Sequence, residues 1–390
     1  MPLVLTRREA CSYLVGHLGL RRWSGRGAQG VRALLERLRC IQLDPLDPMG
    51  TNADLVAMAR VRGIGRGDIY RHLYPGHAFE HFAKERCLLP ASAFPSYRDR
   101  CAETRWWRHA ERLERLPPGL VETVLEEVRA RGPMTAAELE DRGTVAPMEW
   151  QGWRSTSRAA SMALDVLWTR CQVVVCGRTA RGKLFDVPER ALPEVARKSP
   201  AVARESPAAD FLGGAVVERV EAAGLLARAG GATWSMLAEA RENGVADALV
   251  EEGVLEEVVV EGSPRRYLAP RGFRERRHPK ADGLVRILGP LDPLLWDRGL
   301  VRQAFGFEYV WEVYKPLSAR RWGWYVCPLL QGDALVGRVD AAIDGDALRV
   351  KRLWLEEPKP DPDPVREALE RHAAACGAAR VVLPRARSRA

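Results

Sequence analysis

The sequence has no apolar run that approaches the roughly 20 residues needed to cross a bilayer, which excludes a transmembrane helix. Its first nine residues lack the charged-then-apolar order of a secretory signal peptide. The eight cysteines never form a Cys-x-x-Cys pair, so neither a zinc knuckle nor a disulfide framework is indicated. His77 and His81, with Cys87 and Cys101 downstream, could offer metal ligands but lack a second tight ligand pair. We therefore expect a cytoplasmic protein without a metal or another cofactor.

Lysine is also scarce: only seven of the 60 basic residues are lysines, and the rest are arginines. A GC-rich genome accounts for most of this bias. The formal net charge is +9, and such an excess favours a polyanionic partner, of which nucleic acid is the commonest. With 46% hydrophobic and 28% charged residues the composition is that of a globular protein, and 390 residues suffice for two to four domains.

Three stretches of the chain follow one plan, in which three helices precede a two-stranded hairpin. The middle stretch is the clearest. Its apolar spacing predicts helices over Leu120–Arg131 and Ser157–Thr169, and Thr135–Glu138 has the form of a capping box that opens a second helix between them. Two β-rich runs, 172–176 and 183–187, then form a hairpin with arginines in its turn. This is the winged-helix form of the helix-turn-helix motif.

The other two stretches repeat the plan less regularly. The later one predicts helices and then a hairpin, over Ala215–Ala223, Trp234–Glu242, Val245–Glu252, Leu255–Val260 and Arg266–Ala269. The first one opens with a capping box at Thr6–Glu9 and has a second helix over Gln29–Arg39. All three stretches are therefore predicted to be winged-helix modules.

Beyond residue 275 the sequence becomes β-rich. Strands are predicted over four aromatic or β-branched runs, namely Phe307–Tyr314, Trp322–Leu330, Ala334–Val339 and Ala347–Leu355. A proline-rich linker, 358–364, and a helix over Val365–Cys376 follow. We expect four domains: winged-helix modules at 1–115, 116–200 and 201–275, and a small sheet or β-barrel at 276–390.

Residues 40–48 contain the best candidate for chemistry. Pro45 disfavours the helical conformation for Asp44, so the chain should be extended there, with alternate side chains on one face. Ile41 and Leu43 would then point into the core, and Gln42 and Asp44 would point together to the other side. A carboxylate beside an amide can hold a water molecule: the carboxylate accepts its proton, and the amide oxygen or nitrogen orients it. Spacing alone leaves a second interpretation open, in which Asp44 opens a turn and Gln42 is a solvated helix cap.

Several blocks in this order along the chain resemble the winged-helix DNA glycosylases of the AlkZ/YcaQ kind, which unhook interstrand crosslinks and excise N7-alkylated purines. They are Ile41–Leu46, Asp54–Val56, Phe79–Glu80, Leu291–Arg298, Phe305–Tyr309 and Leu335–Asp340. The resemblance implies an α+β fold, with three tandem winged-helix modules and a C-terminal β-barrel in a C-shaped monomer. It also implies a catalytic Gln-x-Asp element, formed here by Gln42 and Asp44, of the type found in the branch with broader specificity.

The sequence departs from the resembled family near Ala53 and Lys84, where that family often has histidine. Lys84 is the only lysine among the first 180 residues, so Schiff-base chemistry has little support and simple hydrolysis is favoured. In the Leu291–Arg298 block, we expect Trp296 in the core and an internal ion pair between Asp297 and Arg298.

The expected partner is double-stranded DNA with alkylated or crosslinked purines, bound by a nucleoid-associated monomer. We expect the turn with Arg320 and Arg321 to enter the minor groove, and Arg178, Arg181 and Lys183 on the middle hairpin to contact phosphates. Solvated turn residues are the alternative interpretation for each. The alternative function is a non-catalytic winged-helix regulator or repair accessory protein, which would need no paired polar side chains at residues 42 and 44.

Overall fold

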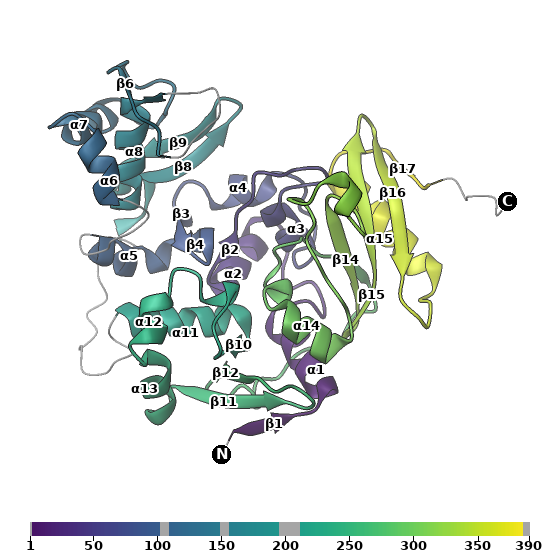
Figure 1. Ribbon diagram of the computed structural model, residues 1–390. Helices are drawn as coiled ribbons and strands as arrows, with labels where there is room; N and C mark the ends of the chain where they lie inside the picture. The colour runs from purple at the N-terminus through teal and green to yellow at the C-terminus, as the bar shows by residue number, and fades with distance from the viewer. Residues whose placement is uncertain (1, 102–108, 149–155, 195–210, 385–390) are drawn as a thin grey trace. The chain divides into compact units, whose positions relative to one another are not determined.

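The computed structural model describes residues 2–101, 109–148, 156–194 and 211–384 (Figure 1). The chain forms two compact units. The first consists of Met1–Ile69, Phe82–Cys87 and the described part of Arg204–Ala390, and the second of Tyr70–His81 and the described part of Leu88–Ala203. Within these ranges, every helix is too short or too polar to be a candidate membrane span. The fold is mixed α+β, as predicted; the boundaries of the four expected domains stay a prediction.

The second unit contains the middle helix–hairpin stretch. Helix α7 (Leu120–Arg131) has the predicted bounds, and α8 (Ala159–Thr169) matches the predicted third helix. Strands β8 (Val174–Thr179) and β9 (Gly182–Asp186) form the expected hairpin, with β5 (Met134–Thr135) on the other side of β9. Thr179 pairs with Gly182, so the hairpin turn is shorter than predicted.

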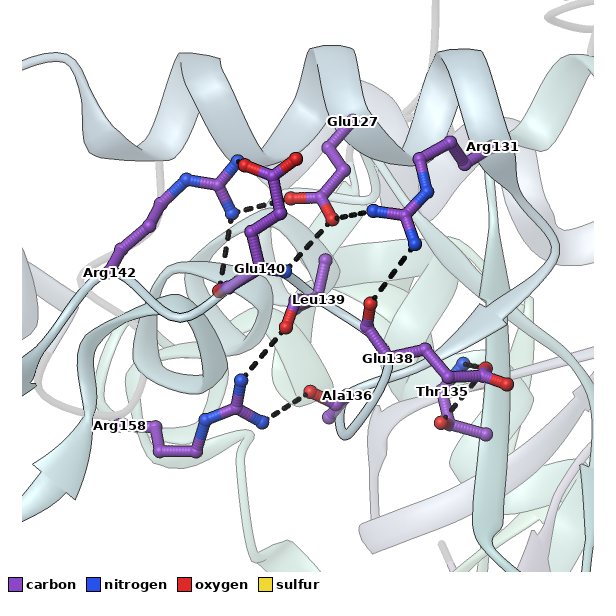
Figure 2. Close-up of polar contacts among 9 residues, drawn as sticks. All are labelled: Glu127, Arg131, Thr135, Ala136, Glu138, Leu139, Glu140, Arg142 and Arg158. Atoms are coloured by element: carbon purple, nitrogen blue, oxygen red, sulfur yellow. Dashed lines mark hydrogen bonds and ion pairs between the residues drawn. The ribbon is translucent and has the colours of Figure 1, made fainter.

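The helix expected after Thr135 is absent, and this prediction was wrong. One half of the capping box does form, because Thr135 donates its backbone N–H and its hydroxyl to the Glu138 carboxylate. However, Arg158 donates to the carbonyl oxygens of Ala136 (3.0 Å) and Leu139 (2.9 Å), and the Glu140 N–H donates to Glu127 (Figure 2). Side chains from neighbouring elements thus satisfy backbone groups that a helix would pair internally, and the segment remains a single turn.

The first unit contains the later helix–hairpin stretch. Its elements are α11 (Phe211–Ala223), β10 (Leu226–Ala227), α12 (Ala238–Glu242), α13 (Val245–Glu251), β11 (Leu255–Val260) and β12 (Arg266–Pro270). Helix α12 is shorter than predicted because Met236 has a positive φ of 65°, which a helix does not allow. Buried Val216, Val220 and Leu249 join the helices in one core.

The N-terminal elements of this unit bring the candidate segment next to two other parts of the chain. Helix α1 (Arg7–His17) starts at the predicted capping box, and α2 (Gly27–Leu38) corresponds to the predicted second helix. Strand β2 (Ile41–Gln42) follows and joins β4 (Glu85–Pro90) and β3 (Ala78–Ala83) in a sheet of order β2-β4-β3. Helix α3 (Asn52–Met58) comes next. The short strand β1 (Leu3–Leu5) was not predicted; it pairs in parallel with β11.

The C-terminal part is a curled half-barrel sheet of five strands in the order β13-β14-β15-β16-β17 (Figure 1). The strands are β13 (Val285–Ile287), β14 (Val326–Gln331), β15 (Ala334–Asp344), β16 (Ala347–Leu355) and β17 (Arg380–Val382). Helix α15 (Pro362–Ala375) buries Val365 and Leu369 against the sheet. It starts inside the predicted linker, because Asp361 caps it and Pro362 suits its first turn.

The strand expected over Phe307–Tyr314 is not present. Helix α14 (Arg298–Phe305) ends at Gly306, which has a φ of 66°, and the following residues form no ladder. Phe307 and Tyr309 are buried, so their apolar character reflects core packing rather than sheet pairing. The sequence pattern was therefore right about burial and wrong about the element.

Candidate active site and DNA-contacting residues

The Ile41–Asp44 segment starts as a strand and ends as a turn. Ile41 is fully buried, and the Leu43 N–H donates to the Arg86 carbonyl at 2.8 Å, which fixes the segment to β4. The predicted alternation of core-facing and outward-facing side chains does not hold: the Gln42 side chain is buried as well, and Leu43 is only half-buried. Strand β2 ends before Asp44, so Gln42 and Asp44 do not share the face of one regular strand.

Gln42 is held by hydrogen bonds from two elements. The Lys84 ammonium donates to Gln42 Oε1 at 2.9 Å, and Asn52 Nδ2 donates to the Gln42 carbonyl oxygen at 2.8 Å. The Lys84 side chain is itself buried, with Nζ 5.1 Å from the centre of the Trp296 ring. Burial lowers the pKa of Lys84, because the charged form loses hydration. Both the side chain and the backbone of Gln42 are thus fixed.

Asp44 is half-buried and opens a turn. Its Oδ1 accepts the Leu46 N–H at 2.9 Å, which is the local bond expected of an aspartate before proline. Burial raises the pKa of Asp44, and the Leu46 hydrogen bond only partly opposes this. A carboxylate with a raised pKa is a better proton acceptor than a solvated one. Asp44 therefore has the structure of a turn residue and also properties suited to a general base.

Tyr325 is a polar residue near Asp44 that the sequence did not single out. Only 1% of it is exposed, and its hydroxyl makes no hydrogen bond within the described residues. Burial raises the pKa of Tyr325, and the nearby Cys327 and Asp44 add to the effect. The sequence offered no hint of this, because Tyr325 lies in an aromatic run that reads as ordinary strand.

The Leu291–Arg298 block is linked to the candidate site by buried hydrogen bonds. Asp292 accepts two hydrogen bonds from Arg60 (2.7 and 2.8 Å), and both side chains are fully buried. Asn52, which holds the Gln42 carbonyl, also accepts the Leu291 N–H at 3.0 Å. A Cβ at Gly289 would lie 2.4 Å from Asn52 Oδ1, so this approach requires glycine. The block therefore fixes the backbone of the candidate motif.

The expected ion pair between Asp297 and Arg298 is absent. Asp297 instead caps α14 by accepting the Leu300 N–H and pairs with Arg265 at 3.4 Å, whereas Arg298 lies over the Tyr309 ring. Trp296 is buried, as expected, and donates its indole N–H to the Leu291 carbonyl at 3.0 Å.

On the middle hairpin, the three predicted phosphate-binding residues lie in different surroundings. Arg178 and Lys183 both form ion pairs with the Glu80 carboxylate, which is fully buried and also accepts the Tyr74 hydroxyl at 3.1 Å. Arg181 is exposed in the turn between β8 and β9. The guanidinium and ammonium groups of the first two are thus partly neutralised, and Arg178 and Arg181 are both exposed.

Arg320 and Arg321 lie on a loop that a buried carboxylate organises. Glu312 accepts the backbone N–H groups of Arg321, Trp322 and Gly323 and the ammonium of Lys315, at 2.7 to 3.3 Å. Burial opposes ionisation, but these hydrogen bonds, that of Trp322 foremost, lower the pKa of Glu312 to about 2. The loop is therefore held in one conformation by a charged group at neutral pH.

The same loop exposes two large apolar side chains that the sequence analysis missed. Tyr314 is 85% exposed and Leu317 is 81% exposed. Arg321 forms an ion pair with Glu308 at 2.8 Å, and Arg320 donates to the Lys315 carbonyl at 2.8 Å. The loop thus presents apolar tips beside basic residues, a combination found in proteins that insert side chains between DNA bases.

The described residues contain no group of three or more side chains suited to a metal. The His81 ring lies tilted against Trp168, with Nε2 3.1 Å from the Thr169 carbonyl oxygen, and the Cys87 thiol donates to the Lys84 carbonyl. The side chain of Cys101 lies outside the described residues.

A family model described as DNA glycosylase AlkZ-like matches residues 35–379, and the chain belongs to this family of DNA glycosylases. The fold is similar to that of the Streptomyces sahachiroi DNA glycosylase AlkZ, with a TM-score of 0.59 over 97% of this chain and 98% of that one. The two sequences are 16% identical, so the likeness is one of fold.

Proposed function

We propose that this protein hydrolyses the N-glycosidic bond of N7-alkylated purines in duplex DNA and also unhooks interstrand crosslinks. It would act as a monomer on the chromosome in the cytoplasm, through Gln42 and Asp44. The observation that carries the proposal is the half-buried Asp44 carboxylate with its raised pKa, two residues after an immobilised Gln42, in a chain of the AlkZ-like family.

The chemistry of the substrate explains why one carboxylate is sufficient. Alkylation at N7 gives guanine a positive charge and makes it a good leaving group, so no general acid is required at the base. The enzyme must stabilise an oxocarbenium-like sugar and deliver water to its anomeric carbon. Asp44 would offset the developing positive charge and accept a proton from the water. The second carboxylate that sugar hydrolases use as an acid is dispensable here.

A crosslinked base cannot be rotated freely into a closed pocket, because it is tied to the opposite strand. We therefore propose that the protein contacts the damaged base within the duplex and does not rotate it into a closed pocket. The loop with Tyr314, Leu317, Arg320 and Arg321 would enter the minor groove. Arg178, Arg181 and Lys183 on the β8–β9 hairpin would contact phosphates.

The test uses two duplex oligonucleotides, one with a single N7-methylguanine and one with a nitrogen-mustard crosslink. With the enzyme in excess, we expect base release and abasic sites on both substrates. Asp44→Asn should reduce the rate by a factor on the order of 10² to 10⁴, because it removes the proton acceptor, and DNA affinity should stay unchanged. No release from either duplex would support the non-catalytic DNA-binding alternative, and an equal loss of affinity would mean that Asp44 is structural.

A further inference from the structure

Lys84 lies in the tight connection between β3 and β4, and its side chain is buried against the candidate active site. Only 6% of the residue is exposed, which is unusual for lysine. Its carbonyl accepts the Cys87 thiol at 3.1 Å, and Glu85 next to it has a positive φ of 59°. The backbone is thus held in a defined turn that directs the ammonium towards Gln42 and the face of Trp296.

The contact between Lys84 and Gln42 decides which way the Gln42 amide faces. A primary amide carries an acceptor oxygen and a donor nitrogen, and either could in principle meet a water molecule. A lysine ammonium has three donors and no acceptor, so only the amide oxygen can face it. Gln42 Oε1 is therefore directed to Lys84, and Nε2, which forms no hydrogen bond to the described residues, faces the other way.

We propose that Lys84 is a positioning residue that fixes the Gln42 amide as a hydrogen-bond donor to the nucleophilic water, leaving Asp44 as the sole proton acceptor. This inference rests on the proposed function. The water oxygen accepts a hydrogen bond from Gln42 Nε2 and forms the new bond to C1′ of the sugar. Its proton passes to Asp44. The electron pair of the broken C1′–N9 bond goes to the cationic purine, which leaves as a neutral base.

The Trp296 ring completes the arrangement. Its face accommodates the ammonium at 5.1 Å, an attraction between a cation and an aromatic ring that partly replaces lost hydration. Because Trp296 is itself fixed to the Leu291 carbonyl, the block around residues 291–298 determines where Lys84 lies. The role of this distant block in catalysis would therefore be indirect, through Lys84 and Gln42.

The experiment is a double-mutant cycle on single-turnover release of N7-methylguanine. Lys84→Met keeps most of the side-chain volume and removes the donor, and Gln42→Ala removes the amide. We expect each single variant to lower the rate by a factor on the order of 100, as for other losses of orientation. The double variant should be no slower than Gln42→Ala, and DNA affinity should not change. Lys359→Met, at an exposed lysine, serves as the matched control.

Two results would overturn the proposal. One is multiplication of the two rate losses in the double variant, since Lys84 would then act independently of Gln42. The other is a covalent adduct with abasic DNA that borohydride traps in the wild type and not in Lys84→Met, because Lys84 would then be a nucleophile.

A readout without turnover separates this inference from the proposed function. The side-chain amide resonance of Gln42 should shift in Lys84→Met and stay in place in Lys359→Met, whether or not the wild type releases a base. An unchanged resonance would show that Lys84 does not orient the amide. Absence of base release together with a shifted resonance would refute the proposed function and leave the contact intact.

Discussion

Asp44 combines a turn-forming hydrogen bond with a raised pKa, and the second property has a kinetic consequence under the proposed mechanism. A general base works only when it is deprotonated, so the rate of base release should fall as the pH drops through the pKa of Asp44. Because burial raises that pKa, the fall should occur above 3.8, the ordinary value for aspartate. N7-methylguanine stays cationic at acidic pH, so the substrate does not contribute to this fall.

Single-turnover rates between pH 4 and 8 test this expectation. Asp47→Asn is a suitable control, since Asp47 is a nearby carboxylate that pairs with Arg66, and it should retain the acidic limb. A rate that stays constant down to pH 4 would contradict the role of Asp44 as the base.

The ion pair of Arg60 and Asp292 links two individual side chains to the stability of the protein. Both side chains are fully buried, so removal of one partner leaves an uncompensated charge. We expect Asp292→Ala to lower the free energy of unfolding by about 3 to 5 kcal/mol. Replacing both with apolar residues, Arg60→Met with Asp292→Leu, should cost much less. Urea denaturation measures both, and the exposed pair of Arg349 and Asp344 provides a contrast of no more than about 1 kcal/mol.

At the scale of elements, the loop from Tyr314 to Arg321 permits a test that separates charge from apolar insertion. Arg320→Ala should weaken DNA binding and reduce the salt dependence of log K by about 0.9, the effect of one lost phosphate contact. Leu317→Ser should weaken binding to a similar extent and leave the salt dependence unchanged, because it removes no charge. Binding isotherms at several salt concentrations distinguish the two. Wild-type affinity in both variants would exclude this loop from the DNA interface.

Individual helices, strands and turns differ in how well the sequence predicts them. Helices with apolar spacing, such as α7, and the β8–β9 hairpin follow from local patterns and were predicted closely. The turn after Thr135 was not, because Arg158 reaches its carbonyl groups from 19 to 22 positions away. In the candidate site, Gln42 and Asp44 follow from residue spacing and resemblance. The contact from Lys84 depends on the pairing of β2 with β4, which no local pattern encodes.

At the scale of the whole molecule, two buried histidines couple stability to pH. Burial lowers the pKa of His17 and of His372 to about 4, whereas the ordinary value in an unfolded chain is about 6.5. Between these values the unfolded state binds more protons, so stability is lost as the pH falls from about 6.5 towards 4. At pH 5 the loss should be about 2 kcal/mol for each histidine.

Denaturation of the wild type at pH 7 and pH 5 measures this loss. His17→Gln and His372→Gln should each lose less stability between the two pH values, and His77→Gln, at an exposed position, should behave as the wild type does. Equal pH dependence in all four proteins would mean that other groups control acid sensitivity.

Strand β1 lies at one end of the chain and pairs in register with β11, where Leu3 is opposite Val258. During synthesis on the ribosome its partner does not yet exist. At about 5 to 20 residues per second, roughly 250 further residues take on the order of 10 to 50 s to translate. The first unit therefore cannot close its sheet co-translationally until β11 has emerged, whereas the second unit, which ends at Ala203, has all its residues earlier. The nascent chain should thus acquire its protease resistance in two stages, with the second unit first.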